Sequence, residues 1–205
     1  MKTLVTILIV LALTCTGARG VTIAFWSFNS ATPMSPDEGA GTLVDATGAG
    51  LSTFVAGVSY GAYTAGSAIS RATPNWASGS QSTRFYEIRV NASSLVALSL
   101  RYDGNRSGTG PTRVDLYYST DGGSSYAFHS SVTQPSSWTA FSFPGLSSIS
   151  GLNNNSDVRF RLCPMSASGT AGTIRFDNIL VEGLPEPAVL GLVAAGLLLL
   201  APRAR

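Results

Sequence analysis

The 205-residue chain is poor in charge, in histidine and in cysteine. Charged residues make up 12% of it, about half of the roughly 25% that is usual in globular domains. The single histidine, His129, excludes a metal site built from several histidines. The sequence has no Gly-x-Ser-x-Gly elbow, phosphate-binding loop or dinucleotide fingerprint. We therefore expect a non-catalytic protein without a bound metal or cofactor.

The N-terminus is organised like a secretory signal peptide. A positive charge precedes the apolar run Leu4–Leu13, which is followed by the small, turn-prone segment Thr14–Gly20. As a helix the apolar run would be about 15 Å long, too short for the roughly 30 Å hydrocarbon core of a bilayer. We expect residues 1–20 to be a signal peptide, with cleavage after Ala18 or Gly20.

Removal of this peptide would leave one cysteine. The chain has two, Cys15 and Cys163, and Cys15 lies in the expected signal peptide. An intramolecular disulfide is then excluded, so the domain must rely on its core for stability. Cys163 ends a predicted strand, and we interpret it as a small buried side chain.

The C-terminus has three zones. A Pro-Glu-Pro tripeptide precedes the wholly apolar segment 188–201, and the chain ends with two arginines. As a helix this segment would be about 21 Å long, so it would cross a bilayer only with membrane thinning or help from flanking residues. The arginines favour the cytoplasmic side. The polar and proline residues of this pattern are Pro185, Glu186, Pro187, Arg203 and Arg205.

This pattern resembles the PEP-CTERM sorting signal, and the resemblance covers residues 184–205. Members of that family are exported proteins of Gram-negative bacteria that make exopolysaccharide. The resemblance implies that an exosortase-like membrane enzyme recognises and processes the tail. It also implies a protein that is membrane-anchored before processing and then at the cell surface or extracellular. The basic cluster departs from the family pattern by having two arginines interrupted by Ala204, and the alternative is a plain membrane anchor.

The segment between the two ends is nearly neutral. From Val21 to Leu184 it contains nine arginines, no lysine and ten acidic residues, a net charge of −1. The net charge of +2 of the whole chain therefore comes from the ends. Such a domain lacks the basic surface with which nucleic-acid-binding proteins hold phosphates. We expect residues 21–183 to form one folded domain with no nucleic-acid partner.

Apolar and polar residues alternate with period two along this domain, which is typical of half-buried antiparallel strands. No stretch has a convincing amphipathic helical pattern, and we expect Asn29–Gly50 to be a long loop. The pattern predicts an all-β, antiparallel two-sheet sandwich that is jelly-roll-like. The alternating segments are Phe85–Val90, Leu98–Tyr102, Arg113–Tyr118, Asp157–Leu162 and Ile174–Asn178. Further candidates are Thr22–Phe28, Thr53–Tyr63, Tyr126–Val132 and Trp138–Phe143.

One local motif resembles the Asp-box of sialidase-like propellers, Ser-x-Asp-x-Gly-x-x-aromatic. It consists of Ser119, Asp121, Gly123 and Tyr126. In those families the box is a hairpin turn away from the active site. The Asp-Gly step supplies the positive φ that a tight hairpin needs, and the aspartate can accept from the N–H groups of its own loop. A propeller needs one copy per blade, so we interpret this single copy as a structural turn anchored by Tyr126.

Two groups of acids have residue types that suit catalysis or Ca²⁺ binding. Glu87 and Asp115 lie on predicted strands, and a glycosidase would need such a pair about 5–10 Å apart on one face. Each has an arginine nearby, so ion pairs are the simpler interpretation. Asp177 would join a Ca²⁺ site only if the acids of the 29–50 loop folded back to it. Pairing of Asp177 with a strand arginine, Arg159 or Arg161, is the simpler expectation.

The aromatic residues suggest sugar binding, because their rings can stack on the apolar side of a pyranose. Most aromatics in a sandwich fill its core. Trp76 lies in a loop, and it is the tryptophan that we expect to be exposed and to contact sugar; Trp26 and Trp138 lie in predicted strands. We interpret His129 as a solvated strand residue.

Two function classes follow from the sequence. The first is an exported, non-catalytic protein of the cell envelope or extracellular matrix, sorted through its tail. The alternative is a carbohydrate-binding, lectin-like module with polysaccharide as its partner. A glycoside hydrolase is the least favoured reading.

Overall fold

The computed structural model describes residues 19–30, 32, 34–47, 53–61, 67–72, 84–168 and 172–186. Most of the expected signal peptide, the sugar-binding candidate Trp76 and the tail from Pro187 onward lie outside these ranges. The expected apolar helix 188–201 therefore lies outside them too. Within the described part of the chain, no helix is long and apolar enough to cross a membrane.

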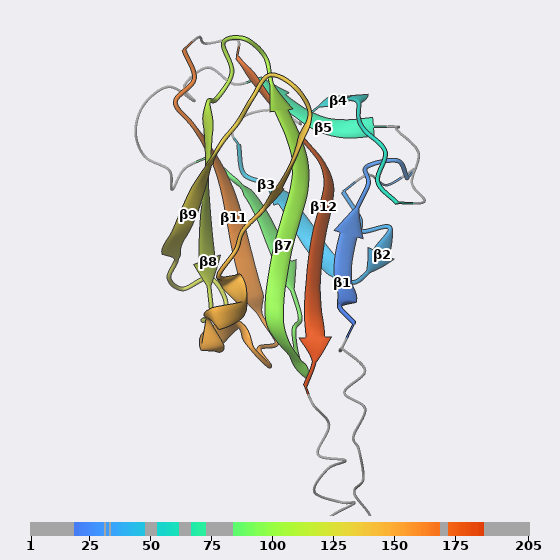
Figure 1. Ribbon diagram of the computed structural model, residues 1–205, viewed down its shortest axis with the longest axis vertical. Coiled ribbons are helices and arrows are strands. Elements are labelled where there is room, and N and C mark those ends of the chain that lie inside the picture. Colours follow the sequence, from blue (N-terminus) through green and yellow to red (C-terminus); the bar gives the residue numbers. More distant parts are fainter. Residues whose placement is uncertain are drawn as a thin grey trace, which may run out of the picture.

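The domain is an antiparallel, jelly-roll-like sandwich of two sheets, which confirms the predicted fold class (Figure 1). Two short 3₁₀ helices, η2 (Leu146–Ser148) and η3 (Ser150–Leu152), precede β11. Sheet A consists of β1 (Val21–Trp26), β2 (Glu38–Gly39), β4 (Thr53–Ala56), β5 (Ser67–Ala72), β7 (Leu95–Arg106), β10 (Thr139–Ser142) and β12 (Thr173–Pro185). Sheet B consists of β3 (Gly41–Asp45), β6 (Tyr86–Val90), β8 (Arg113–Ser119), β9 (Ala127–Thr133) and β11 (Val158–Met165).

The order of strands places long strands at the centre of each sheet. Sheet A runs β10-β7-β12-β1-β2, with β5 added to β12 and β4 to β5. Sheet B runs β3-β6-β11-β8-β9, so β3 and β9 are its edges. Strands β1 and β12 are partners, and Val21 faces Gly183 across this pair. The start of β1 and the end of β12 therefore lie at the same end of the sandwich (Figure 1).

The core lies between the sheets and is filled by the apolar half of each alternating strand. The ring of Phe176 on β12 lies edge-on to Tyr86 of β6, with 5.3 Å between the ring centroids. It also lies edge-on to Tyr102 of β7, at 5.0 Å. All three side chains are fully buried. Aromatic pairs in this geometry stabilise beyond their buried area, so Phe176 ties the two sheets together.

The prediction that Asn29–Gly50 is one long loop is wrong in part, because β2 and β3 lie inside it. Strand β3 pairs with β6, and its Leu43 is buried opposite Ile88. Gly39 has a φ of 72°, and a Cβ there would lie 2.1 Å from the carbonyl oxygen of Ile23. Such short strands carry too few alternating residues to stand out from a polar, proline-containing segment.

Strand β12 is far longer than the alternation predicted, because a bulge interrupts its period. The register with β7 shifts between Asp177 and Leu180, and Asn178 has a φ of 48°. Ile174 and Phe176 face the core before the bulge, and Ile179 and Val181 face it afterwards. A bulge moves later residues to the opposite phase. The pattern from Ile174 to Asn178 therefore predicted only the first half of the strand.

Candidate functional site

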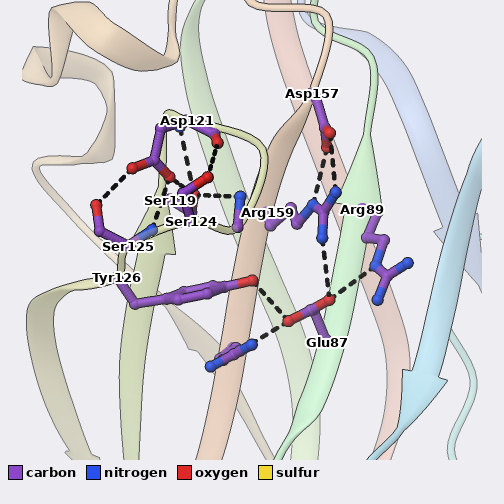
Figure 2. A network of polar contacts seen from close by, with 11 residues as sticks. Glu87, Arg89, Ser119, Asp121, Ser124, Ser125, Tyr126, Asp157 and Arg159 are labelled. Carbon is purple, nitrogen blue, oxygen red and sulfur yellow. Dashed lines mark hydrogen bonds and ion pairs between the residues drawn. The ribbon is translucent and has the colours of Figure 1, made fainter.

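The Asp-box-like motif forms the predicted turn between β8 and β9 (Figure 2). Asp121 Oδ1 accepts hydrogen bonds from the Ser125 amide at 2.9 Å and the Ser119 hydroxyl at 2.7 Å. The Ser125 hydroxyl donates to Oδ2 at 2.6 Å. These bonds, led by the one from the Ser125 hydroxyl, hold the pKa of Asp121 well below its usual value. The motif is a structural turn, as predicted.

The motif also requires glycine at position 123. Gly123 has a φ of 88°, a backbone conformation that favours glycine. A Cβ there would lie 2.6 Å from Arg159 Nη1 and 2.9 Å from the Tyr126 hydroxyl oxygen. The turn therefore brings its backbone directly against the outer face of sheet B.

Tyr126 anchors the turn to that face, as the sequence predicted. Its hydroxyl donates to Glu87 Oε2 at 2.7 Å (Figure 2). Its ring lies over the guanidinium carbon of Arg161 at 3.5 Å from the centroid. The ring of Phe85 lies 4.0 Å from the same carbon. Arg161 is thus held by two aromatic rings, a contact that is strongest when the cation is desolvated.

Glu87 is the centre of this polar network. Its side chain is 2% exposed, and it accepts from Arg161 Nε and from Arg89 Nε, both at 2.7 Å. Arg159 Nη1 lies 3.9 Å from Glu87 Oε1, and the Arg159 guanidinium forms a bidentate pair with Asp157 at 2.9 Å. Burial raises the pKa of Glu87, but the hydrogen bonds from Tyr126, Arg161 and Arg89 together lower it below its usual value. Glu87 is therefore ionised at neutral pH.

Asp115 is the second acid that the sequence singled out on this sheet. It is 2% exposed, forms an ion pair with Arg113 at 2.8 Å, and accepts from the Ser131 hydroxyl at 2.7 Å. Strand β11 separates it from Glu87, so the two acids are at least roughly 10 Å apart. The prediction of arginine partners for both acids is confirmed.

An aromatic pair with one exposed ring, Phe128, and one half-buried ring, Tyr117, lies beside this network. Within the described residues, Phe128 and Val21 are the exposed large hydrophobic side chains, and Phe128 is 55% exposed. Phe128 on the edge strand β9 pairs in register with Tyr117 of β8. Their rings are edge-on, with centroids 5.5 Å apart. Because Leu116 points into the core, its neighbour Tyr117 and the facing Phe128 lie on the outer face of sheet B.

The outer face of sheet B therefore combines exposed rings with fixed polar groups. Four arginines face three acids across it, so the face has a net charge of about +1 by count. Rings next to rigid donors and acceptors suit a ligand with apolar patches and many hydroxyls. Sequence reasoning does not single out Phe128 or Tyr117, because alternation places both on strands but does not show which face of the sheet the turn leaves open. The charged residues are Glu87, Arg89, Arg113, Asp115, Asp157, Arg159 and Arg161.

Several other predicted residues occupy structural positions. Trp26 is fully buried in the core and Trp138 is half-buried. Cys163 is 1% exposed, and burial raises the pKa of its thiol to about 12, which confirms its reading as a buried side chain. The expectation that His129 is solvated is wrong. Its ring is half-buried and edge-on to Tyr118, and burial lowers its pKa.

The expected pairing of Asp177 with Arg159 or Arg161 is also wrong, because both arginines lie on the other sheet. Asp177 instead accepts from the amides of Val58 at 2.7 Å and Asn178 at 2.8 Å. No group of three potential metal-binding side chains of histidine, cysteine, aspartate or glutamate occurs in the described part of the chain. The bulge at Asp177 turns its carboxylate toward residues 57–61 rather than toward an arginine.

Asp177 and its neighbours fix residues 57–61 on sheet A. The Asn178 side-chain amide donates to the Val58 carbonyl at 3.0 Å and to Asp103 Oδ2 at 2.9 Å. Asp103 in turn pairs with Arg101 at 3.2 Å. Burial raises the pKa of Asp177 to about 7, and the nearby Asp103 carboxylate adds to this, against the two amides that lower it. Asp177 is thus a buried acid that titrates near neutrality.

The expected sorting motif begins inside the sheet. Pro185 is the last residue of β12 and lies opposite Leu95. The Glu186 amide donates to the Ser94 carbonyl at 3.0 Å. Pro187, Arg203 and Arg205 lie outside the described residues.

Comparison with known proteins finds solved structures that are similar at low sequence identity. No protein-family model and no curated protein matches the sequence. A CBM4 structure is similar with a TM-score of 0.44 and 16% identity, covering 77% of this chain and 96% of the other. The K2 adhesin domain of Lys-gingipain gives a TM-score of 0.48 and 14% identity, covering 79% of this chain and 97% of the other. The CBM22-1 xylan-binding domain from Paenibacillus barcinonensis gives a TM-score of 0.48 and 10% identity, covering 82% of this chain and 97% of the other.

We predict that Glu87→Gln lowers the free energy of unfolding by about 3 kcal/mol, because it leaves Arg161 between two rings without its counter-charge. Asp157→Asn is the matched control, since the Asp157 side chain is 48% exposed and should cost less than about 1 kcal/mol. Urea unfolding followed by tryptophan fluorescence measures both. Equal losses for the two variants would show that the Glu87 network does not hold this face.

We also predict that ionisation of Asp177 lowers the free energy of unfolding as the pH rises from 4.5 to 8. The folded-state pKa of Asp177, about 7, lies above the roughly 3.9 of an unfolded aspartate, so its stabilising effect is lost as it ionises. The slope is at most about 1.4 kcal/mol per pH unit. Asp177→Asn should remove this slope, whereas Asp121→Asn should keep it, because the pKa of Asp121 is already low. Unfolding curves across the pH series measure both, and parallel profiles for wild type and Asp177→Asn would refute the prediction.

Proposed function

We propose that this chain is an exported, non-catalytic module that binds polysaccharide through the outer face of sheet B. The observation that carries the proposal is the exposed ring of Phe128, held edge-on against Tyr117 on a sheet face. A large aromatic ring is costly to leave in water, and an exposed one on a flat sheet offers a stacking surface for the apolar side of a sugar ring.

Hydrogen-bonding groups flank this aromatic pair. Asp115, Arg113 and Ser131 form a connected group on the same two strands, β8 and β9. The exposed side chains of Arg113 and Ser131 can donate to and accept from sugar hydroxyls, and the buried Asp115 holds both in place. A few fixed polar groups around an apolar surface are the usual composition of a small-ligand site.

The Glu87 network makes this surface rigid. Arg161 lies on β11, next to Tyr117 in register, and is held by Glu87 and by two rings. A site whose side chains are already fixed loses little conformational entropy when a ligand binds. The network therefore supports the binding of a ligand without rearrangement of these side chains.

The same contacts argue against hydrolysis. Glu87 and Asp115 are each 2% exposed, and arginine partners occupy both carboxylates. A general acid needs a raised pKa and access to the glycosidic oxygen, whereas the pKa of Glu87 is lowered. Binding without catalysis is the function that fits these two acids.

The sorting of the protein is proposed from its sequence. The tail from Pro185 to Arg205 resembles a PEP-CTERM signal, so an exosortase-like enzyme is the proposed processing partner. The apolar segment 188–201 would hold the chain in the membrane before processing, and the domain would then act at the cell surface or outside the cell. A module that binds polysaccharide suits that location.

We predict that Phe128→Ala and Tyr117→Ala each lower the affinity for a bound polysaccharide about five-fold or more, because stacking of a ligand ring on one aromatic side chain is worth roughly 1–3 kcal/mol where it has been measured for nucleobases. Val21→Ala removes an exposed apolar side chain from sheet A and is the matched control. Affinity electrophoresis against a panel of neutral polysaccharides, including the organism's own exopolysaccharide, measures the effect. The proposal fails if no polysaccharide retards the wild-type chain, or if Val21→Ala and Phe128→Ala behave alike.

We predict that a chain truncated after Glu186 is exported but no longer processed or retained in the membrane. This end point keeps β12 and the contact of Glu186 with Ser94, so the domain should fold as before. Fractionation and mass measurement in a host that has an exosortase, and in a mutant that lacks it, measure the difference. A full-length chain that stays in the membrane with unchanged mass in both hosts would instead identify a plain anchor.

A further inference from the structure

An open polar hollow lies on the outer face of sheet B, away from Phe128. Its volume is about 260 Å³, and it lies where β3, β6 and the residues before β11 meet. Pockets that hold a whole small ligand begin at roughly 300 Å³, so this hollow suits one sugar unit or its substituent. The side chains of Arg89 and Asp157 in its lining are 42% and 48% exposed, so a ligand can reach them. The polar lining also includes Thr42, Asn91 and Ser156.

Arg89 is the arginine of this face whose terminal nitrogens have no partner among the described residues. Its Nε donates to Glu87 Oε1 at 2.7 Å, which fixes the guanidinium on the β3 side of Glu87 (Figure 2). The other arginines of the face are more fully occupied. Arg113 and Arg159 each form a bidentate pair with an acid, and Arg161 is held between two rings. Arg89 therefore offers a fixed guanidinium with two free NH₂ groups.

Three guanidinium groups share two carboxylates around this hollow. Glu87 accepts from both Arg89 and Arg161, and Asp157 is bound to Arg159. One positive charge is therefore left over by count. Arg161 is 22% exposed beneath its rings and Arg89 is 42% exposed, so the excess charge is most accessible at Arg89.

The acid of the β8–β9 turn does not cancel this charge locally. The Asp121 carboxylate accepts from Ser119 and Ser125 of its own turn. Strand β11 also lies between β8, which leads into that turn, and β6, which carries Arg89. A guanidinium with an unbalanced charge attracts anions.

The hollow and the aromatic pair lie on one continuous face. In register, Phe128 faces Tyr117, and Tyr117 faces Arg161 of β11. Arg161 in turn faces Glu87 of β6, and Arg89 is two residues further along that strand, on the same side. Neighbouring strands are about 4.8 Å apart, so β9 and β6 are roughly 14 Å apart. A short oligosaccharide stacked on Phe128 can therefore reach Arg89.

We propose that this hollow is an anion subsite, in which Arg89 binds the carboxylate of a uronic acid unit of the polysaccharide. The proposal rests on the proposed polysaccharide face and names the class of polymer that it selects. The two free NH₂ groups of Arg89 can donate to both oxygens of a planar carboxylate. The exposed side chains of Thr42, Asn91 and Ser156 can bind the neighbouring sugar hydroxyls.

Calorimetric titration of the purified full chain with short oligogalacturonates, and with the same oligosaccharides after reduction of their carboxylates to neutral alcohols, tests the proposal. We expect the acidic form to bind about five-fold more tightly, the upper end for an exposed ion pair. Arg89→Gln should abolish this preference. Arg89→Lys should reduce it to about two-fold, because an ammonium keeps the charge without the planar pair of donors. Arg101→Gln removes the same charge from sheet A and, as the matched control, should keep the full preference.

Three outcomes would overturn the proposal: equal affinity of the wild type for the two forms, no binding of either form, or a preference that survives in Arg89→Gln. Equal losses of preference in Arg89→Gln and Arg101→Gln would instead identify a general charge effect, which also overturns it. Thermal unfolding shows that each variant is folded, and Arg89→Lys decides the matter if Arg89→Gln is not.

Failure of the stacking proposal has a different signature. Phe128→Ala should weaken the acidic and the reduced oligosaccharide alike, because the ring contacts the apolar side of both. If Phe128→Ala weakens neither while Arg89→Gln still abolishes the preference, the stacking surface is wrong and the anion subsite stands. If Phe128→Ala weakens both while the wild type has no preference, the anion subsite is wrong and the stacking surface stands.

Discussion

Burial of the Glu87 carboxylate is the constraint on which the outer face of sheet B depends. A charge with 2% exposure is stable only if partners replace its water, and three strong donors do so here. Each partner is thereby fixed: Tyr126 anchors the β8–β9 turn, and Arg161 is held between two rings. Because the turn is fixed, β9 keeps its register with β8, and the ring of Phe128 stays beside Tyr117. The position of Phe128 beside Tyr117 thus depends on the ionised carboxylate of Glu87.

On sheet A, the bulge in β12 fixes a neighbouring segment, residues 57–61. Asn178 adopts a positive φ, and its side chain and that of Asp177 satisfy both backbone groups of Val58. These bonds attach residues 57–61 to a sheet whose outer face carries Phe25 and Leu180. The strain of a left-handed asparagine is offset by the hydrogen bonds that its side chain donates to the Val58 carbonyl and to Asp103.

The sequence predicted those parts of the structure that depend on local patterns. Alternation identified β6, β8 and β11, the spacing from Ser119 to Tyr126 identified the turn, and proximity of opposite charges identified arginine partners for Glu87. Short strands such as β2 and β3 carry too few residues for a pattern, and a bulge inverts the phase that the pattern relies on. The exposure of Phe128 depends on what covers a face, which is a property of three-dimensional packing. The tryptophan chosen instead, Trp76, lies outside the described residues.

The outer face of sheet B is charged, yet its arginines are paired with acids: Arg89 and Arg161 with Glu87, Arg113 with Asp115, and Arg159 with Asp157. Paired opposite charges leave little long-range field, so salt should have little effect on the binding of a neutral ligand there. Stacking on Phe128 and Tyr117 would then supply most of the binding free energy, and the fixed polar side chains beside these rings would set the orientation of the sugar.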